Sequence, residues 1–311
     1  MNPAVAPRVS VVMPTYNLER YVGQAIASVL AQSEASFELL VVDDASTDAT
    51  RDAVRAFHDD RLRLFVMERN GGQSAARNRA LAEARGEWVA LIDADDWWAP
   101  ERLERLLEAA DLADAAMVAD DCHLIEDGAT RPWGSLLWLH GLHIDTPRLI
   151  GAAEFVRSDL GPTKPVIRRD VVVRHGIAFD EKLHHVEDFA FGLDCLLAGA
   201  SLLVVPEAYY FYRARRGART SDRVGTLREH AEVAERLARD ERVRPDPELR
   251  RALARVARLD RSGMPYYELV AFIKAGRMAS AARVVLRSPG VLQVLARHLP
   301  MVLRARLSRP R

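Results

Sequence analysis

Cysteine is scarce in this sequence of 311 residues, and long apolar runs are absent. The two cysteines, Cys122 and Cys195, are far apart and have neither the spacing of metal ligands nor that of a redox motif, which excludes a disulfide framework and indicates a reducing compartment. No apolar run reaches the roughly 18 to 20 residues that cross a bilayer, and the first residues lack the charged and apolar regions of a signal peptide. We therefore expect a cytoplasmic protein without a membrane-spanning helix.

The common glycine-rich phosphate loops are also missing. No Gly-x-Gly-x-x-Gly follows the first predicted strand, and no Walker-type Gly-Lys-Ser/Thr loop occurs in the chain. A glycine pair, Gly71–Gly72, is present, but it follows the third predicted strand. These absences disfavour a dinucleotide-binding fold.

Acidic residues are missing from the last part of the chain. The sequence has 44 basic and 44 acidic residues, but no acid follows Glu268 while nine basic residues do, which leaves 35 basic against 44 acidic residues before that point. The basic end either forms a solvated helical face or attracts an anionic surface such as lipid. Because the body of the chain is acidic, we expect no nucleic-acid partner.

Short apolar runs alternate with segments of helical periodicity, which predicts an α/β fold with a parallel, doubly wound sheet. The predicted strands are Val9–Met13, Phe37–Val42, Leu62–Met67, Val89–Ile92 and Ala116–Ala119, and the helices between them end near Gln32, Phe57, Ala84 and Ala110. Residues 127–160 are expected to be irregular. Beyond Arg223 the pattern is helical, with breaks that include Gly263 and Pro265. We predict a domain of residues 1–225 and a helical, basic extension of residues 226–311.

Three carboxylates follow the predicted strand Val89–Ile92, at Asp93, Asp95 and Asp96. The carboxyl edge of an open α/β sheet is where ligands bind. Carboxylates two residues apart suit a hard divalent cation, Mg²⁺ or Mn²⁺, that also binds phosphate oxygens. The alternative is that these residues only begin the helix that contains Pro100.

Polar residues also follow the first two strands, as Pro14-Thr15-Tyr16-Asn17 and as Asp43-Asp44-Ala45-Ser46. Asp44 can accept a hydrogen bond from a uracil imide or a ribose hydroxyl if the Tyr16 ring packs against the base, although Ser46 or Thr47 also caps the next helix. The Gly71–Gly72 pair precedes a helix that contains Arg77. It can present backbone N–H groups to an anion, or it can be an ordinary turn before a helix.

Two later segments carry charged groups. Glu187-Asp188 begins an apolar helical run, where a carboxylate stays ionised and can serve either as a base or as a helix cap. Aromatic residues 209–212 precede Arg213, Arg215, Arg216 and Arg219, which can meet a pyrophosphate or can form a basic loop.

In their order along the chain, five motifs resemble those of a family 2 glycosyltransferase with the GT-A fold: residues 9–17, 41–48, 70–78, 93–96 and 187–188. The resemblance covers roughly residues 8 to 220. It implies an inverting transfer from a nucleotide sugar, with UDP-sugars as the usual donors. By position, Asp44 would hold the base, Asp93 the ribose or the metal, Asp95 the Mg²⁺ or Mn²⁺, with Asp96 sharing or replacing it, and Asp188 would be the general base.

The chain departs from the processive synthases of this family, because it has neither a Gln-x-x-Arg-Trp motif nor several membrane spans. A single-addition enzyme is therefore favoured. Relatives of this type build cell-surface polysaccharides on a glycan or lipid-linked acceptor at the inner membrane face, and the basic end, with apolar residues from Val291 to Leu307, suits peripheral attachment there.

Two other functions remain open. A sugar-nucleotide nucleotidyltransferase would have a glycine-rich loop after the first strand, where this chain has Pro14-Thr15-Tyr16-Asn17. A nucleotide-sugar-binding protein without turnover would have no need to retain all these acids.

Overall fold

A computed structural model describes residues 6–214 and 222–291, which form two compact units. The first unit contains residues 6–151 and 160–214, and the second contains residues 152–159 and 222–291. All the residues predicted from the sequence to form the site belong to the first unit.

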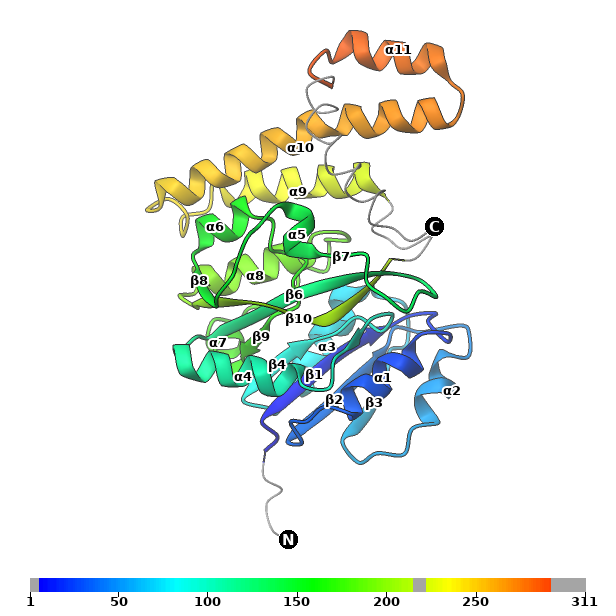
Figure 1. Ribbon diagram of the computed structural model, residues 1–311, viewed down its shortest axis with the longest axis vertical. Helices are drawn as coiled ribbons and strands as arrows, with labels where there is room; N and C mark the ends of the chain where they lie inside the picture. Colours follow the sequence, from blue (N-terminus) through cyan, green and yellow to red (C-terminus); the bar gives the residue numbers. More distant parts are fainter. Residues whose placement is uncertain (1–5, 215–221, 292–311) are drawn as a thin grey trace. The chain divides into compact units, whose positions relative to one another are not determined.

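The first unit is built on one sheet with the strand order β3-β2-β1-β4-β9-β6-β10-β5, to which β7 and β8 add at β6 and β10 (Figure 1). Strands β3, β2, β1 and β4 run parallel, as the alternating sequence pattern predicted. The strands are β1 (Val9–Thr15), β2 (Phe37–Asp43), β3 (Leu62–Val66), β4 (Trp88–Leu91), β5 (Trp97–Trp98), β6 (Met117–Glu126), β7 (Gly134–Ser135), β8 (Arg148–Ile150), β9 (Val166–Arg168) and β10 (Leu202–Ala214).

Helices cover both faces of this sheet. Alternate side chains of β1, such as Val9 and Val11, pack against α1 and α4, because successive residues of a strand point to opposite faces. Helix α3 lies on the other face (Figure 1). The helices of this unit are α1 (Val22–Leu30), α2 (Thr50–Arg55), α3 (Gln73–Glu83), α4 (Arg102–Ala113), α5 (Leu136–His140), α7 (Arg169–Arg174) and α8 (Glu187–Leu197).

The part of the chain after β6 differs from the sequence expectation. Residues 127–160 are not irregular throughout, since they contain β7, α5, β8 and α6 (Ala152–Arg157). Strand β9 lies between β4 and β6 and is antiparallel to both. Residues Leu202–Ala214 form the single long strand β10, whose register with β6 is irregular between Val204 and Tyr210.

The second unit is helical and contains α6, α9 (Arg223–Leu237), α10 (Pro247–Lys274) and α11 (Met278–Arg287). The predicted break at Gly263 and Pro265 is wrong, because α10 continues through both. Proline costs an interior helix about 3 kcal/mol, but here the following turn buries Tyr266 and Leu269 in a core with Ala281 of α11. At Gly263 a Cβ would lie 3.4 Å from Leu227 of α9, which is ordinary contact, so the close packing of α9 does not depend on this glycine.

No helix in the described part of the chain is both long enough and apolar enough to span a bilayer.

Candidate active site

Asp93 and Asp188 come from distant parts of the sequence and lie at one site. Asp93 directly follows the β4 region, and Asp188 is in the first turn of α8. Arg77 of α3 donates from Nη2 to Asp93 Oδ1 (2.7 Å) and from Nη1 to Asp188 Oδ1 (2.8 Å) and Glu187 Oε1 (3.3 Å). One guanidinium therefore joins three carboxylates, as its planar fork of donors allows.

Lys164 is a second bridge between the same two aspartates. Its Nζ lies 3.0 Å from Asp93 Oδ2 and also donates to Asp188 Oδ2. Lys164 lies just before the short strand β9, which begins at Val166, and it is 5% exposed. Burial alone would lower the pKa of Lys164, but the charges of Asp188 and Asp93 raise it above its usual range.

The two cations determine the ionisation of this cluster. Burial opposes the charge of Asp93, yet the neighbouring Lys164 and Arg77 hold the pKa of Asp93 well below its usual range. The pKa of Arg77 is raised, because the charges of Asp188, Asp93 and Glu187 outweigh its burial. Three carboxylates and two cations leave a net negative charge, which suits a cationic ligand or a metal-bound one.

Asp44 is held by the glycine pair that the sequence analysis marked as an anion site. Gly71 N donates to Asp44 Oδ1 (2.7 Å) and Gly72 N donates to Asp44 Oδ2 (2.8 Å), so the anion that meets these N–H groups here is the Asp44 carboxylate. Gly72 has φ of 87°, a conformation that glycine adopts without strain. A Cβ on Gly71 would lie 3.0 Å from Ala75 Cβ, which is tighter than ordinary contact.

A hydrogen-bonded path joins Asp44 to the cluster. Gly72 caps α3, the next residue Gln73 donates from Nε2 to Asp93 Oδ1 (2.8 Å), and Arg77 lies one turn further along the same helix. The first turn of α3 thus places Asp44 next to the Asp93 end of the site.

The residues after β1 lie at the same edge of the sheet. Thr15 pairs with Asp43 where β1 and β2 end. Just after this pair, Asp44 N donates to Thr15 O (2.9 Å), which keeps the two following loops together. Tyr16 is 45% exposed, which leaves its ring available for stacking. Asn17 Oδ1 accepts from Thr47 N (2.8 Å), which ties the loop after β1 to the loop after β2. Pro14 is buried within β1.

Asp95 and Asp96 have different environments although they are adjacent. Asp96 is buried, and its two carboxylate oxygens accept from Tyr210 Oη (2.8 Å) and Arg213 N (2.8 Å). Burial raises the pKa of Asp96 well above its usual value, and the charges of Asp95 and Asp93 add to this effect. Asp95 is only half-buried, and its backbone carbonyl accepts from Arg213 Nε (2.7 Å).

A divalent cation at this site would draw on few protein ligands. No cluster of three or more His, Cys, Asp or Glu side chains in the described ranges forms a complete metal site. Mg²⁺ and Mn²⁺ bound with nucleotides need only one or two carboxylates, because phosphate oxygens and water complete the shell. Asp95 and Asp93, which follow β4, would supply those carboxylates.

The arginines predicted to meet a pyrophosphate are not all described. Arg213 is used internally, since it also donates from Nη2 to Gln24 Oε1 (2.6 Å) and lies over the Trp97 ring. Arg215, Arg216 and Arg219 lie outside the described residues.

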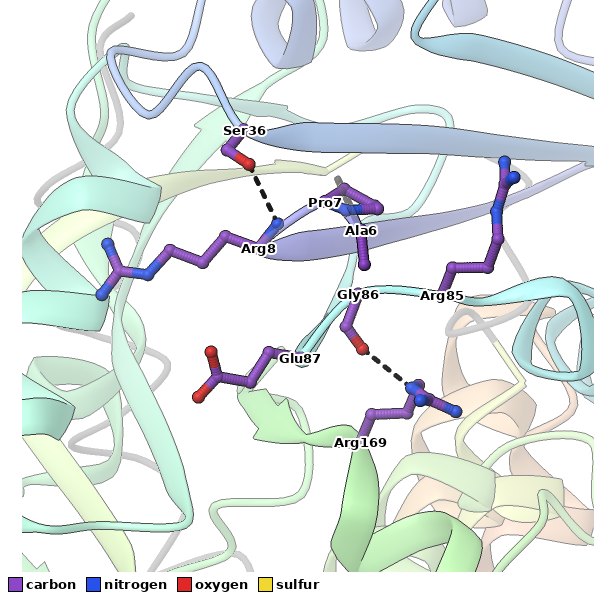
Figure 2. Close-up of a pocket in the computed structure, with 8 residues that line it drawn as sticks. All are labelled: Ala6, Pro7, Arg8, Ser36, Arg85, Gly86, Glu87 and Arg169. Atoms are coloured by element: carbon purple, nitrogen blue, oxygen red, sulfur yellow. Dashed lines mark hydrogen bonds between the residues drawn. The ribbon is translucent and has the colours of Figure 1, made fainter. Parts of the chain in front are cut away.

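A separate cleft of about 370 Å³ lies at the amino ends of β1 and β4, at the opposite edge of the sheet (Figure 2). Arg8 and Arg85 line it but pair with Glu34 and Glu38. It contains none of the residues predicted from the sequence to bind or react.

Three residues of the site were not predicted from the sequence. They are Lys164, which pairs with Asp93 and Asp188, Gln73, which donates to Asp93, and Tyr210, which donates to Asp96. Lys164 had one available signal, because it is one of three lysines in a chain whose other basic residues are all arginine. Lysine carries a compact point charge, whereas arginine carries a planar fork of donors. A lysine in a chain rich in arginine therefore indicates a position where the compact charge suffices.

A half-parallel sheet covered by helices on both faces, with acids gathered at the carboxyl end of β4, defines a GT-A type of transferase fold. The sequence profile described as "Glycosyl transferase family 2" matches residues 10–175. The chain belongs to glycosyltransferase family 2.

Individual proteins support this assignment. The chain is 34% identical over 320 residues to the succinoglycan biosynthesis protein ExoO of Rhizobium meliloti (strain 1021), which covers 99% of this chain and 89% of ExoO. S. aureus TarS 1-349 in complex with UDP-GlcNAc has a TM-score of 0.69 at 23% identity, over 97% of this chain and 88% of TarS. The mannosyltransferase PcManGT from Pyrobaculum calidifontis, in complex with GDP-Man and Mn²⁺, has a TM-score of 0.64 at 20% identity, over 98% of this chain and 87% of PcManGT.

Proposed function

We propose that this protein is an inverting, metal-dependent glycosyltransferase that moves a sugar from a UDP-sugar to a hydroxyl of a glycan or lipid-linked acceptor. One observation carries the proposal: Asp93 and Asp188, from β4 and α8, are joined by Arg77 and Lys164 at one edge of the sheet. The acid proposed to bind the donor and the acid proposed to be the general base can therefore reach one bound substrate.

Asp188 is the proposed general base. The acceptor oxygen attacks the anomeric carbon, the bond from that carbon to the diphosphate breaks, and the hydroxyl proton passes to the Asp188 carboxylate. Arg77 and Lys164 each use one lone pair of a different Asp188 oxygen. Since a carboxylate has about four such positions, the cations fix its orientation and still leave a place for the proton.

Asp95 is the proposed principal metal ligand, with Asp93 as the second. Asp96 is proposed mainly as a support, because it is buried with both its oxygens accepting hydrogen bonds from β10, whereas the Asp93 side chain is 19% exposed. When bound, Mg²⁺ or Mn²⁺ supplies positive charge to the leaving diphosphate.

Asp44 and Tyr16 are the proposed base-binding pair, with Pro14, Thr15 and Asn17 shaping the pocket around them. The fold does not select the base, because TarS is titled with UDP-GlcNAc and PcManGT with GDP-Man. UDP is proposed because Asp44 can accept a hydrogen bond from the uracil imide while the exposed Tyr16 ring stacks on the base.

The name of ExoO supports a role in building a cell-surface polysaccharide. We place the reaction in the cytoplasm, at the inner membrane face, in agreement with two free, buried thiols that fit a reducing compartment.

The test is a panel of UDP-, GDP- and dTDP-sugars, assayed for binding by thermal shift and for turnover by nucleoside diphosphate release, with Mn²⁺ and with chelator. Release of UDP that requires both an acceptor and the cation is the expected result. Pyrophosphate release from a nucleoside triphosphate and a sugar phosphate would instead establish a nucleotidyltransferase. Binding with no product across a broad acceptor panel would establish a silent nucleotide-sugar-binding protein.

A further inference from the structure

The hairpin formed by α10 and α11 exposes large apolar side chains at its turn and along α11. Ile273 is 50% exposed, Met278 is 63% exposed and Leu286 is 80% exposed. Ile273 is at the end of α10 and Met278 begins α11, so they flank the turn at Gly276. Side chains of this size are normally buried when they lie together, so the cluster requires an explanation.

Two of these residues, Met278 and Leu286, belong to one apolar ridge of α11. Met278, Ala282 and Leu286 follow each other at intervals of four along α11, which places them on one line about 12 Å long. The neighbouring line of the same helix contains Arg283 and Arg287, and both are exposed. An apolar line beside a basic line is the arrangement of helices that lie in a membrane interface.

The other side of α11 holds this ridge in place. Ala281 is buried against Tyr266 and Leu269 of α10, and Figure 1 shows α11 running back along the end of that helix. Arg277 lies over the Phe272 ring at 4.9 Å, which fixes the turn. The exposed ridge is thus presented by a packed hairpin.

The charge of the turn and of α11 has one sign. Lys274 and Arg277 at the turn join Arg283 and Arg287 on α11, and no acid occurs in the sequence after Glu268. The four cations are exposed. A nucleic acid would match the charge but would have no use for the apolar ridge, whereas an anionic bilayer surface offers phosphate groups above an apolar interior.

We propose that the α10–α11 hairpin is a membrane-docking surface that binds anionic phospholipid, with Met278 and Leu286 entering the interface and Lys274, Arg277, Arg283 and Arg287 contacting lipid phosphates. The proposal deepens the proposed function by naming the surface on which a lipid-linked acceptor would be met. Its test needs no sugar transfer, so failure of the glycosyltransferase assay and failure of lipid binding are distinguishable.

The experiment is co-sedimentation of the full chain with vesicles of phosphatidylcholine alone and of phosphatidylcholine mixed with phosphatidylglycerol. We expect binding only to the mixed vesicles, and weaker binding as salt increases. The double variant Arg283→Gln/Arg287→Gln should lower the partition coefficient by about thirtyfold, because each basic residue near an anionic surface contributes about 1 kcal/mol and about 1.4 kcal/mol is a tenfold change. Met278→Ser/Leu286→Ser should lower it by about tenfold.

Two matched controls are available in the first unit. Leu112 of α4 is 90% exposed, so Leu112→Ser removes an exposed leucine elsewhere. Arg55→Gln/Arg105→Gln removes two exposed arginines from α2 and α4. Neither control should alter vesicle binding. Thermal melts of all variants report whether the fold is kept.

Three outcomes would overturn the proposal. These are equal binding to both vesicle types, unchanged binding of both hairpin variants, and a large loss of melting temperature in Met278→Ser/Leu286→Ser. The last would mean that another part of the chain covers the ridge. Glycerol phosphate at millimolar concentration should leave binding unchanged, and its displacement of the protein from vesicles would identify a free-phosphate site instead.

Discussion

Lys164 Nζ lies 3.0 Å from Asp93 Oδ2 and pairs at the same time with Asp188. One buried amine thereby joins the carboxyl end of the parallel half of the sheet to the first turn of α8. Together with Arg77, it determines how far apart the proposed donor-binding acid and the proposed base can lie.

Replacing Lys164 by Met should destabilise the protein, because Asp93, Asp188 and Glu187 would then share only the charge of Arg77. Removal of one partner from a buried ion pair costs about 3 to 5 kcal/mol; the partial exposure of the two aspartates reduces this to about 2 to 4 kcal/mol. Urea unfolding measures the difference. Lys182 is exposed, so Lys182→Met is the matched control and should leave the unfolding midpoint unchanged. Equal midpoints for Lys164→Met and wild type would contradict a bridging role.

Asp188→Asn should lower kcat by about 10² to 10⁴, the range for loss of a general base. Its binding of UDP should change little, since the nucleotide is assigned to Asp44, Tyr16 and Asp93. Stopped assays give kcat and calorimetry gives the UDP dissociation constant. Asp170→Asn, on the exposed surface of α7, is the control. An Asp188→Asn enzyme with full activity would remove the base assignment.

Gly72→Ala should destabilise the first unit and weaken donor binding together. The φ of 87° and ψ of 166° at Gly72 are nearly restricted to glycine, so alanine costs about 1 to 3 kcal/mol there and moves the N–H groups away from Asp44. Gly128 also has a positive φ, of 80°, but it lies in another loop. Gly128→Ala should lose stability and keep the wild-type KM for donor. If both variants keep that KM, the Asp44 loop does not shape the donor site.

The parallel half of the sheet could be predicted because its signals are local. Val89–Ile92 is apolar and bounded by Gly86 and Asp93, and such a run specifies a buried strand without knowledge of its neighbours. The acids that follow this strand could therefore be placed at the carboxyl edge of the sheet. The structure brings Asp93 and Asp188 together there.

The place of strand β9 in the sheet and the role of Lys164 could not be predicted in this way. The apolar run Val166–Ile167 indicates an extended segment, but three residues, Val166–Arg168, carry too little pattern to show that it inserts between β4 and β6. The role of Lys164 depends on two carboxylates that are distant in sequence, and no periodicity reports such a pairing. The break predicted at Pro265 was wrong for a related reason. The packing of Tyr266 and Leu269 outweighs the unfavourable helix propensity of proline.

Asp95→Asn and Asp96→Asn should separate metal binding from structural support. Chelation should abolish transfer by the wild type, and Mn²⁺ should restore it. The Mn²⁺ concentration for half-maximal activity should rise by about tenfold in Asp95→Asn. In Asp96→Asn it should stay near the wild-type value, because Asp96 bonds to Tyr210 and Arg213. Larger metal dependence in Asp96→Asn than in Asp95→Asn would reverse the two roles.

The helical unit should lose stability as the pH rises above neutrality, through His230. Its Nδ1 lies 3.0 Å from Asp260 Oδ2; burial lowers the pKa of His230, but the hydrogen bond and charge of Asp260, and the charge of Asp159, raise it above its usual value. A histidine with a raised folded-state pKa contributes stability that is fully present below its unfolded pKa, about 6.5. That stability is lost as the pH rises through the folded-state pKa.

Melting temperatures of the full chain, measured from pH 6 upward, should therefore fall over this window. Asp260→Asn removes the carboxylate that raises the pKa, so its melting temperature should be lower at pH 6 and should depend less on pH. Because the pairing stabilises only the protonated form, the two proteins should converge at the alkaline end. A wild-type melting temperature that rises over the same window, or curves that remain parallel, would show that the pair does not couple protonation to folding.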